Sequence, residues 1–74
     1  MGDKQIRMTR HAVERGLRFD LDPSNIEKII REGQRFVEGK SKVRYVLRMR
    51  RGVYVAICEE SPDLIVVKTI TRGK

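Results

Sequence analysis

The chain has 74 residues, of which 39% are hydrophobic and 36% charged, and its formal net charge is +7. This length allows one domain, residues 1–74, and the absence of a long apolar run excludes a membrane-spanning helix and a signal peptide, so we expect a soluble cytoplasmic protein. A single cysteine and a single histidine exclude an internal disulfide and a zinc cluster, and we expect no metal and no cofactor.

The first predicted helix covers residues 10–18. Thr9 can cap its amino terminus, and the segment contains no proline and no run of β-branched residues. Gly16 weakens the helical tendency of this segment. The preceding "QIRM", residues 5–8, could be one more extended segment, but four residues do not decide it.

A second helix is predicted over residues 23–32 by stronger signals. Asp22 stands in the N-cap position, Pro23 occupies the first helical position and Gly33 follows the end. The apolar residues of this segment share one face: Ile26, Ile29 and Ile30. This face is expected to pack on the core.

After Gly33 the apolar residues alternate with polar ones, which is the period of β-strands. Three strands are predicted, at residues 42–50, 52–60 and 63–71, and residues 34–39 could form a further short strand. The breaks between them are short and imply antiparallel hairpins. The predicted fold is therefore α+β, with two N-terminal helices packed on one face of a three- to four-stranded antiparallel meander sheet.

The two faces of this sheet depend on the turn between the predicted strands at residues 42–50 and 52–60. If Arg51 and Gly52 form a two-residue turn, Arg50 lies opposite Val53. The core face then holds Val43, Tyr45, Leu47, Met49, Tyr54, Ala56 and Cys58. The second face mixes cations with apolar residues: Arg44, Val46, Arg48, Val55, Ile57, Leu64, Val66, Lys68 and Ile70. A face of this kind is typical of a nucleic-acid groove or a dimer interface.

Basic residues are concentrated in one segment, residues 40–51, which holds six cations and no acidic residue. Such a segment attracts polyanions, and nucleic acid is the commonest of them. The candidate nucleic-acid-binding residues are Lys42, Arg44, Arg48, Arg50 and Lys68. The simpler interpretation is a solvated basic strand that keeps the protein soluble and protects a sheet edge.

His11 is the only histidine, and Arg15 lies one helical turn later on the same face. Histidine exchanges a proton near neutral pH, and a guanidinium holds a phosphate with two hydrogen bonds. RNA cleavage without a metal needs an acid, a base and cations for the charge on the phosphate. We therefore take His11, Arg15 and Glu59 as candidate catalytic residues, while a solvated histidine on a polar helix face remains the simpler alternative.

The stretch "TRHAVERG" resembles a family of small domains that begin with a Ser/Thr-Arg-His-Ala-x-x-Arg signature. The matching positions are Thr9, Arg10, His11, Ala12, Arg15, Ile26, Ile30, Gly33 and the strand ending in "VVKTIT". These domains resemble the BrnT and RelE ribonuclease-toxin superfamily, whose members place two helices before an antiparallel sheet. The resemblance implies one domain of this type over residues 1–74, with His11 and Arg15 at its reactive corner, and an antitoxin-type protein partner.

The leading functional hypothesis is an RNA-interacting domain of the ribonuclease-toxin type, and metal-independent endoribonuclease activity is one form of it. The alternative is a non-catalytic interaction protein that forms a homodimer or binds a protein partner through the apolar half of the second sheet face. A DNA-binding module fits less well, because the basic residues lie on a strand rather than on a recognition helix.

Overall fold

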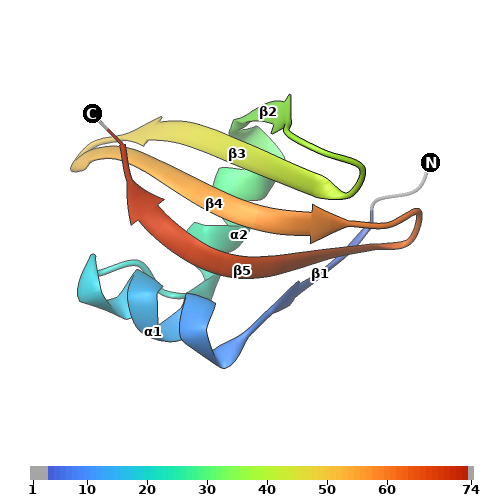
Figure 1. Cartoon of the computed structure of the whole chain (residues 1–74). Helices are drawn as coiled ribbons and strands as arrows, with labels where there is room; N and C mark the ends of the chain where they lie inside the picture. Colours follow the sequence, from blue (N-terminus) through green and yellow to red (C-terminus); the bar gives the residue numbers. More distant parts are fainter. Residues whose placement is uncertain (1–3, 74) are drawn as a thin grey trace.

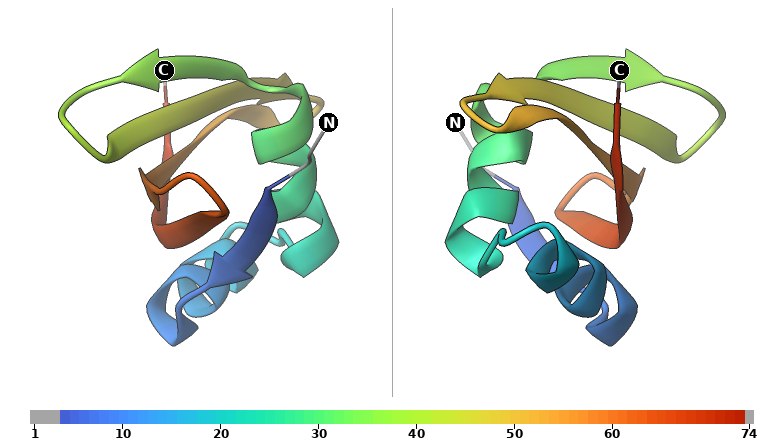
Figure 2. Two further views of the ribbon diagram at one scale, coloured as in Figure 1. Left: turned by 90° about the vertical axis from the view of Figure 1, so that its right-hand side faces the viewer. Right: turned by 90° about the vertical axis from the view of Figure 1, so that its left-hand side faces the viewer.

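The computed structural model describes residues 4–73, which form two helices and a five-stranded sheet (Figure 1). In chain order the elements are β1 (Gln5–Met8), α1 (Arg10–Arg18), α2 (Pro23–Glu32), β2 (Gln34–Val37), β3 (Lys42–Met49), β4 (Gly52–Glu60) and β5 (Leu64–Arg72). The sheet is strongly curved, and α2 packs behind β3 and β4 while α1 lies along β5 (Figure 2). No described element covers the opposite face of the sheet, here termed the open face.

The strand order β1-β5-β4-β3-β2 corrects the predicted architecture. Gln5–Met8 is a strand that pairs in parallel with β5, with Ile6 opposite Ile65, so the sheet is mixed and has five strands. The prediction of two helices on a three- to four-stranded antiparallel meander is therefore wrong. Parallel pairing joins segments from opposite ends of the chain, and a four-residue segment carries too little alternation to reveal it.

Local hydrogen bonds start both helices where the sequence predicts. Thr9 Oγ1 accepts a hydrogen bond from Ala12 N at 3.1 Å, which caps α1. The Asp22 carboxylate accepts from Asn25 N at 2.9 Å, and Asn25 Oδ1 accepts from Asp22 N at 3.1 Å, so α2 begins with a reciprocal capping box. The hydrogen bond from the Asn25 backbone lowers the pKa of Asp22.

The end of α1 is closed by a residue in the left-handed conformation, Asp20, with φ of 62°. Asp20 N donates to Leu17 O at 3.0 Å, and Leu21 N donates to Gly16 O at 2.8 Å. These two bonds are the Schellman arrangement, in which glycine is the usual left-handed residue. An aspartate at this position is therefore unusual.

The core lies between the helices and the inner face of the sheet. Gly16 permits this packing, because a Cβ there would come within 2.8 Å of Ile26 Cδ1. The buried hydrophobic residues of the core are Ala12, Leu21, Ile26, Ile29, Ile30, Val43, Tyr45, Tyr54, Ala56, Cys58, Ile65, Val67 and Ile70. The predicted packing of the isoleucines of α2 and of the alternate residues of β3 and β4 is confirmed.

The registers of the strands differ from the prediction in two ways. The two-residue turn is Arg50–Arg51, so Met49 lies opposite Gly52 and every pair shifts by two, which leaves the same residues on each face. In β5, Cys58 pairs with Val67 and Ile57 with Thr69, so Lys68 is an extra residue in a bulge. The bulge turns Ile70 into the core, and its predicted place on the open face is wrong.

Candidate functional site

Four exposed arginines gather where β3 turns into β4. The turn Arg50–Arg51 projects from the end of the sheet, and β5 returns along β4 until Arg72 lies opposite Tyr54. The four side chains, together termed the arginine corner, are Arg48, Arg50, Arg51 and Arg72. They line an open hollow of about 650 Å³ together with Met49, Gly52, Val53 and Gly73.

Glycine at position 52 allows the Arg72 side chain to pack against the β3–β4 turn. Its φ is +143°, which L side chains rarely adopt, and a Cβ there would lie 3.2 Å from Arg72 Nη2. The same guanidinium nitrogen donates a hydrogen bond to Arg51 O at 3.1 Å. The end of β5 is therefore attached to the β3–β4 turn through a hydrogen bond that a side chain at position 52 would crowd.

The charge of the corner is only weakly compensated. Arg51 Nη1 lies 3.5 Å from Asp20 Oδ2, and these two side chains are 63% and 83% exposed. The side chains of Arg48 and Arg50 form no hydrogen bond or ion pair with any residue between 4 and 73. Exposed guanidinium groups with so little compensation create a positive potential that attracts anions.

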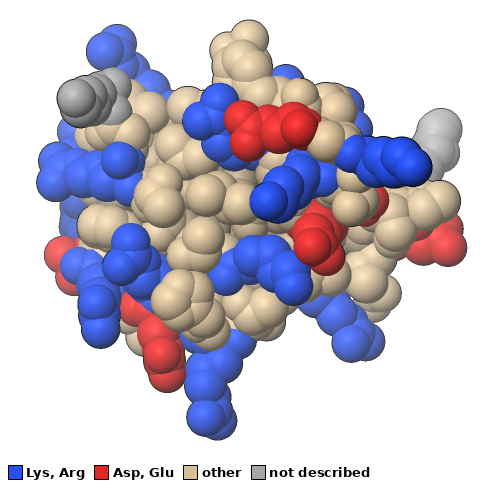
Figure 3. All heavy atoms as spheres, in the orientation of Figure 1, with Lys and Arg blue, Asp and Glu red and all other residues tan. Residues whose placement is uncertain are grey.

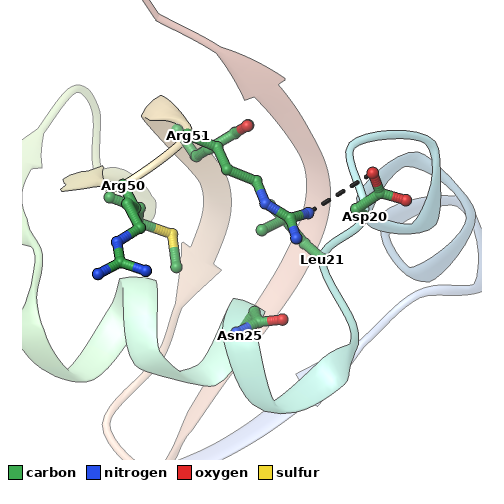
Figure 4. A pocket seen from close by; sticks show the side chains of 7 residues that line it. Asp20, Leu21, Asn25, Arg50 and Arg51 are labelled. Carbon is green, nitrogen blue, oxygen red and sulfur yellow. Dashed lines mark ion pairs between the residues drawn. The ribbon is translucent and has the colours of Figure 1, made fainter.

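A smaller pocket of about 180 Å³ adjoins the open hollow (Figure 4). It shares Met49, Arg50 and Arg51 with that hollow, and Arg51 reaches toward Asp20 across the pocket. The remaining lining residues are Leu21, Asn25 and Tyr54. The pocket therefore combines apolar walls with a carboxylate, an amide and two guanidinium groups.

Three of the predicted nucleic-acid-binding cations lie away from this corner, on the open face. Arg44 Nε lies 2.9 Å from Glu38 Oε2 without the alignment of a hydrogen bond, and its guanidinium carbon is 5.8 Å from the centre of the Phe36 ring. Lys68 Nζ lies 3.9 Å from Glu59 Oε1, and Lys42 is the pairing partner of Glu59. Figure 3 accordingly shows basic and acidic side chains interleaved around an uncharged centre.

The candidate catalytic residues occupy separate environments. His11 is exposed on α1 and makes no hydrogen bond or ion pair with the part of the chain that the structure describes. Arg15 Nε donates to Ile70 O at 3.4 Å, and its guanidinium carbon lies 5.9 Å from the centre of the Phe19 ring, so this side chain packs on β5. Glu59 is paired with Lys68. Within residues 4–73, no hydrogen bond or ion pair joins His11, Arg15 and Glu59.

The tyrosines and the cysteine have the core positions expected from the sequence. Tyr45 and Tyr54 are buried, and Tyr54 packs against Phe19 with the ring centres 5.7 Å apart. Cys58 is fully buried, and desolvation by burial raises its pKa to about 12. A thiol with this pKa is protonated at neutral pH and is not a nucleophile.

Two corner residues, Arg51 and Arg72, are absent from the sequence-based set of binding residues. Arg51 belongs to the basic segment of residues 40–51, so the sequence could have indicated it as a binding residue. The sequence did not indicate Arg72, because the position of this residue beside the β3–β4 turn depends on the pairing of β5 with β4.

Within residues 4–73, no three His, Cys, Asp or Glu side chains lie close enough together to bind a metal ion. The two described helices are also too short or too polar to cross a membrane. No family model, curated protein or solved structure matches the chain. The function is therefore inferred from the chemistry of the site itself.

Proposed function

We propose that this protein binds single-stranded RNA and that the arginine corner holds the phosphate backbone. The observation that carries the proposal is the convergence of four exposed arginines around one open hollow. Among the described residues that line this hollow and the pocket beside it, Asp20 is the one acidic residue. Guanidinium groups match phosphate geometry with two parallel hydrogen bonds.

The shape of the corner favours a chain of phosphates over a single small anion. The hollow is open and lies at the end of the sheet, with cations on the turn and on the last residue of β5. A flexible single strand can follow such an open surface, whereas proteins that recognise duplexes more often present a basic helix. Helix α2 offers no such surface, because Glu27 and Glu32 balance Lys28 and Arg31.

The proposal concerns binding and includes no cleavage step. The ribonuclease hypothesis assigns cleavage to His11, Arg15 and Glu59, and within residues 4–73 these side chains form no hydrogen bond or ion pair with the arginine corner. Incubation of labelled RNA with the parent protein and with His11→Ala tests that hypothesis separately. We expect intact RNA in both reactions and equal affinity; cleavage by the parent that is lost in His11→Ala would extend the function to catalysis.

Fluorescence anisotropy with a labelled single-stranded RNA, measured over a series of salt concentrations, tests the binding proposal. The double variant Arg48→Gln/Arg50→Gln removes two exposed cations that have no ion pair within residues 4–73. The control Arg10→Gln/Lys40→Gln removes the same charge from exposed positions outside the corner. If each corner arginine contacts one phosphate, the slope of log affinity against log salt should become about 1.4 units shallower in the first variant only.

Equal affinity and equal salt slope in the two double variants would overturn the proposal. Such a result would mean that only the net charge of +7 matters, and that the corner has no special part in binding.

A further inference from the structure

We propose that the small pocket beside the arginine corner accepts one unstacked nucleobase whose Watson–Crick edge presents an exocyclic amino donor next to a ring acceptor, namely cytosine or adenine. This inference rests on the RNA binding proposed above and adds the part of the RNA that the pocket recognises. It is carried by the size of the pocket, the chemistry of its walls, its continuity with the proposed phosphate-binding hollow and the left-handed backbone of Asp20, which lines it.

The volume of the pocket suits one flat ring. At about 180 Å³ it is smaller than the roughly 300 to 1,000 Å³ of sites for drug-sized ligands. It shares Arg50 and Arg51 with the open hollow, so a phosphate held by these guanidinium groups would place its own base at the pocket. One nucleotide of a bound strand could thus occupy both sites at once.

The walls of the pocket suit an aromatic heterocycle. Leu21, Met49 and Tyr54 supply apolar surface against which a base can be buried. Arg50 and Arg51 supply planar cations, on which bases stack in single-stranded complexes. A ring without charge but with a large π-face matches these walls better than a sugar or a free phosphate.

Two polar groups at the pocket can read the edge of the base. The Asp20 carboxylate only accepts hydrogen bonds, so it selects a donor such as an exocyclic amino group. Asn25 Oδ1 is engaged by Asp22 N, which directs the amide nitrogen of Asn25 to other acceptors, such as a ring nitrogen or carbonyl of the base. On the Watson–Crick edge, cytosine and adenine carry an amino donor next to a ring acceptor. Uracil presents a carbonyl at the position of this amino group, and guanine presents an N1–H donor beside its own amino group.

The geometry of Asp20 indicates that its carboxylate adds little to the stability of the fold. Its φ of 62° is tolerated best by glycine, and glycine is the usual residue at this place in a Schellman arrangement. Its ion pair with Arg51 is long and exposed, and pairs of this kind stabilise proteins very little. A ligand could therefore displace Arg51 from Asp20 at small cost and use both groups.

The test compares the affinities of three labelled RNA homopolymers, each of eight nucleotides with cytosine, adenine or uracil as its base, by fluorescence anisotropy at fixed salt. We expect the parent protein to bind the cytosine and adenine oligomers about tenfold more tightly than the uracil oligomer, in line with one base-edge contact. Asp20→Asn and Asp20→Gly should both reduce this preference at least threefold. Asp20→Gly should at the same time raise the melting temperature, because it relieves the left-handed backbone, which separates loss of recognition from loss of fold.

The outcomes distinguish this inference from the proposed function. Equal binding of the three oligomers, or an unchanged preference in both Asp20 variants, would overturn the base pocket while the salt-dependent arginine contacts stand. An RNA affinity that does not respond to Arg48→Gln/Arg50→Gln would overturn the proposed function, and with it the inference.

Discussion

Glu60 shows how single residues of this small protein combine burial with charge. Its side chain is 10% exposed, accepts a hydrogen bond from Lys4 Nζ and lies 2.9 Å from Arg35 Nη2. Burial raises the pKa of Glu60, but the hydrogen bonds from Lys4 and Arg35 outweigh this effect, so the pKa lies below its ordinary value. The carboxylate thereby ties the start of β1 and the edge strand β2 to the end of β4.

Because the pKa of Glu60 is lower in the folded state, its charge stabilises the fold at neutral pH. This contribution is present above the ordinary carboxyl pKa of about 4.3 and is lost as the pH falls through the lowered value. We expect Glu60→Gln to lower the urea midpoint at pH 7 and the difference from the parent to shrink between pH 4.5 and pH 3. Glu32→Gln, at an exposed position, is the control, and a constant difference at all pH values would contradict the prediction.

Gly52 links backbone conformation to the arginine corner. Alanine at this position must adopt a strained φ and displace the Arg72 guanidinium, so we expect Gly52→Ala to lose at least about 1 kcal/mol of unfolding free energy and to bind RNA more weakly. Gly39→Ala is the matched control, because its Cβ would make an ordinary 3.6 Å contact with Lys42 Cβ. Urea denaturation and anisotropy measure the two effects, and equal behaviour of the two variants would contradict them.

Among the elements, α2 contributes most to the core from the helical side. Its capping box fixes the first turn, and its three buried isoleucines lie on the face that packs on β3 and β4. The end of α1 and the start of α2 also bring Asp20, Leu21 and Asn25 to the small pocket. The stability of this helix and the shape of the proposed base pocket are therefore coupled.

The packing of α2 can be tested with Ile29, which is fully buried. We expect Ile29→Ala to lower the free energy of unfolding by about 2 to 5 kcal/mol, which includes the cost of the cavity left behind. Lys28→Ala, at the exposed neighbouring position, should change it by less than about 0.5 kcal/mol. Urea denaturation monitored by circular dichroism gives both values; a small effect of Ile29→Ala would mean that α2 is not part of the cooperative core.

At the scale of the whole molecule, the mixed sheet brings the two ends of the chain together. β1 pairs with the first half of β5, and α1 then runs along the remainder of this strand. There Thr9 Oγ1 donates to Lys68 O at 3.1 Å and Arg15 Nε donates to Ile70 O at 3.4 Å. β5 is thus enclosed on both sides, which is why Arg72 reaches the β3–β4 turn in a fixed position.

The parallel pairing predicts protection of specific backbone amides against hydrogen exchange. Gln5 N donates to Asp63 O at 3.2 Å and Thr9 N donates to Val67 O at 3.1 Å. We expect both amides to exchange slowly, as expected for hydrogen-bonded strand positions, while the amide of Lys40, in an exposed loop, exchanges fast. Exchange by NMR gives the three rates, and unprotected Gln5 and Thr9 amides would favour the antiparallel meander instead.

The sequence by itself determined the features that depend on neighbouring residues. Both helices with their N-caps, the strands β3, β4 and β5, the core positions of Tyr45 and Tyr54 and the basic character of residues 40–51 follow from local propensity, capping chemistry and alternation.

Only the tertiary structure decided the features that depend on pairing between distant segments. The parallel β1–β5 pair, the bulge at Lys68 that turns Ile70 inward and the approach of Arg72 to Arg51 are fixed by long-range hydrogen bonds and packing. The same limit applies to the site, of which the sequence indicated Arg48 and Arg50 but neither Arg72 nor the pocket beside Asp20. Alternation specifies which residues can share a face, whereas the free energy of the whole packed sheet selects the partner strand and the register.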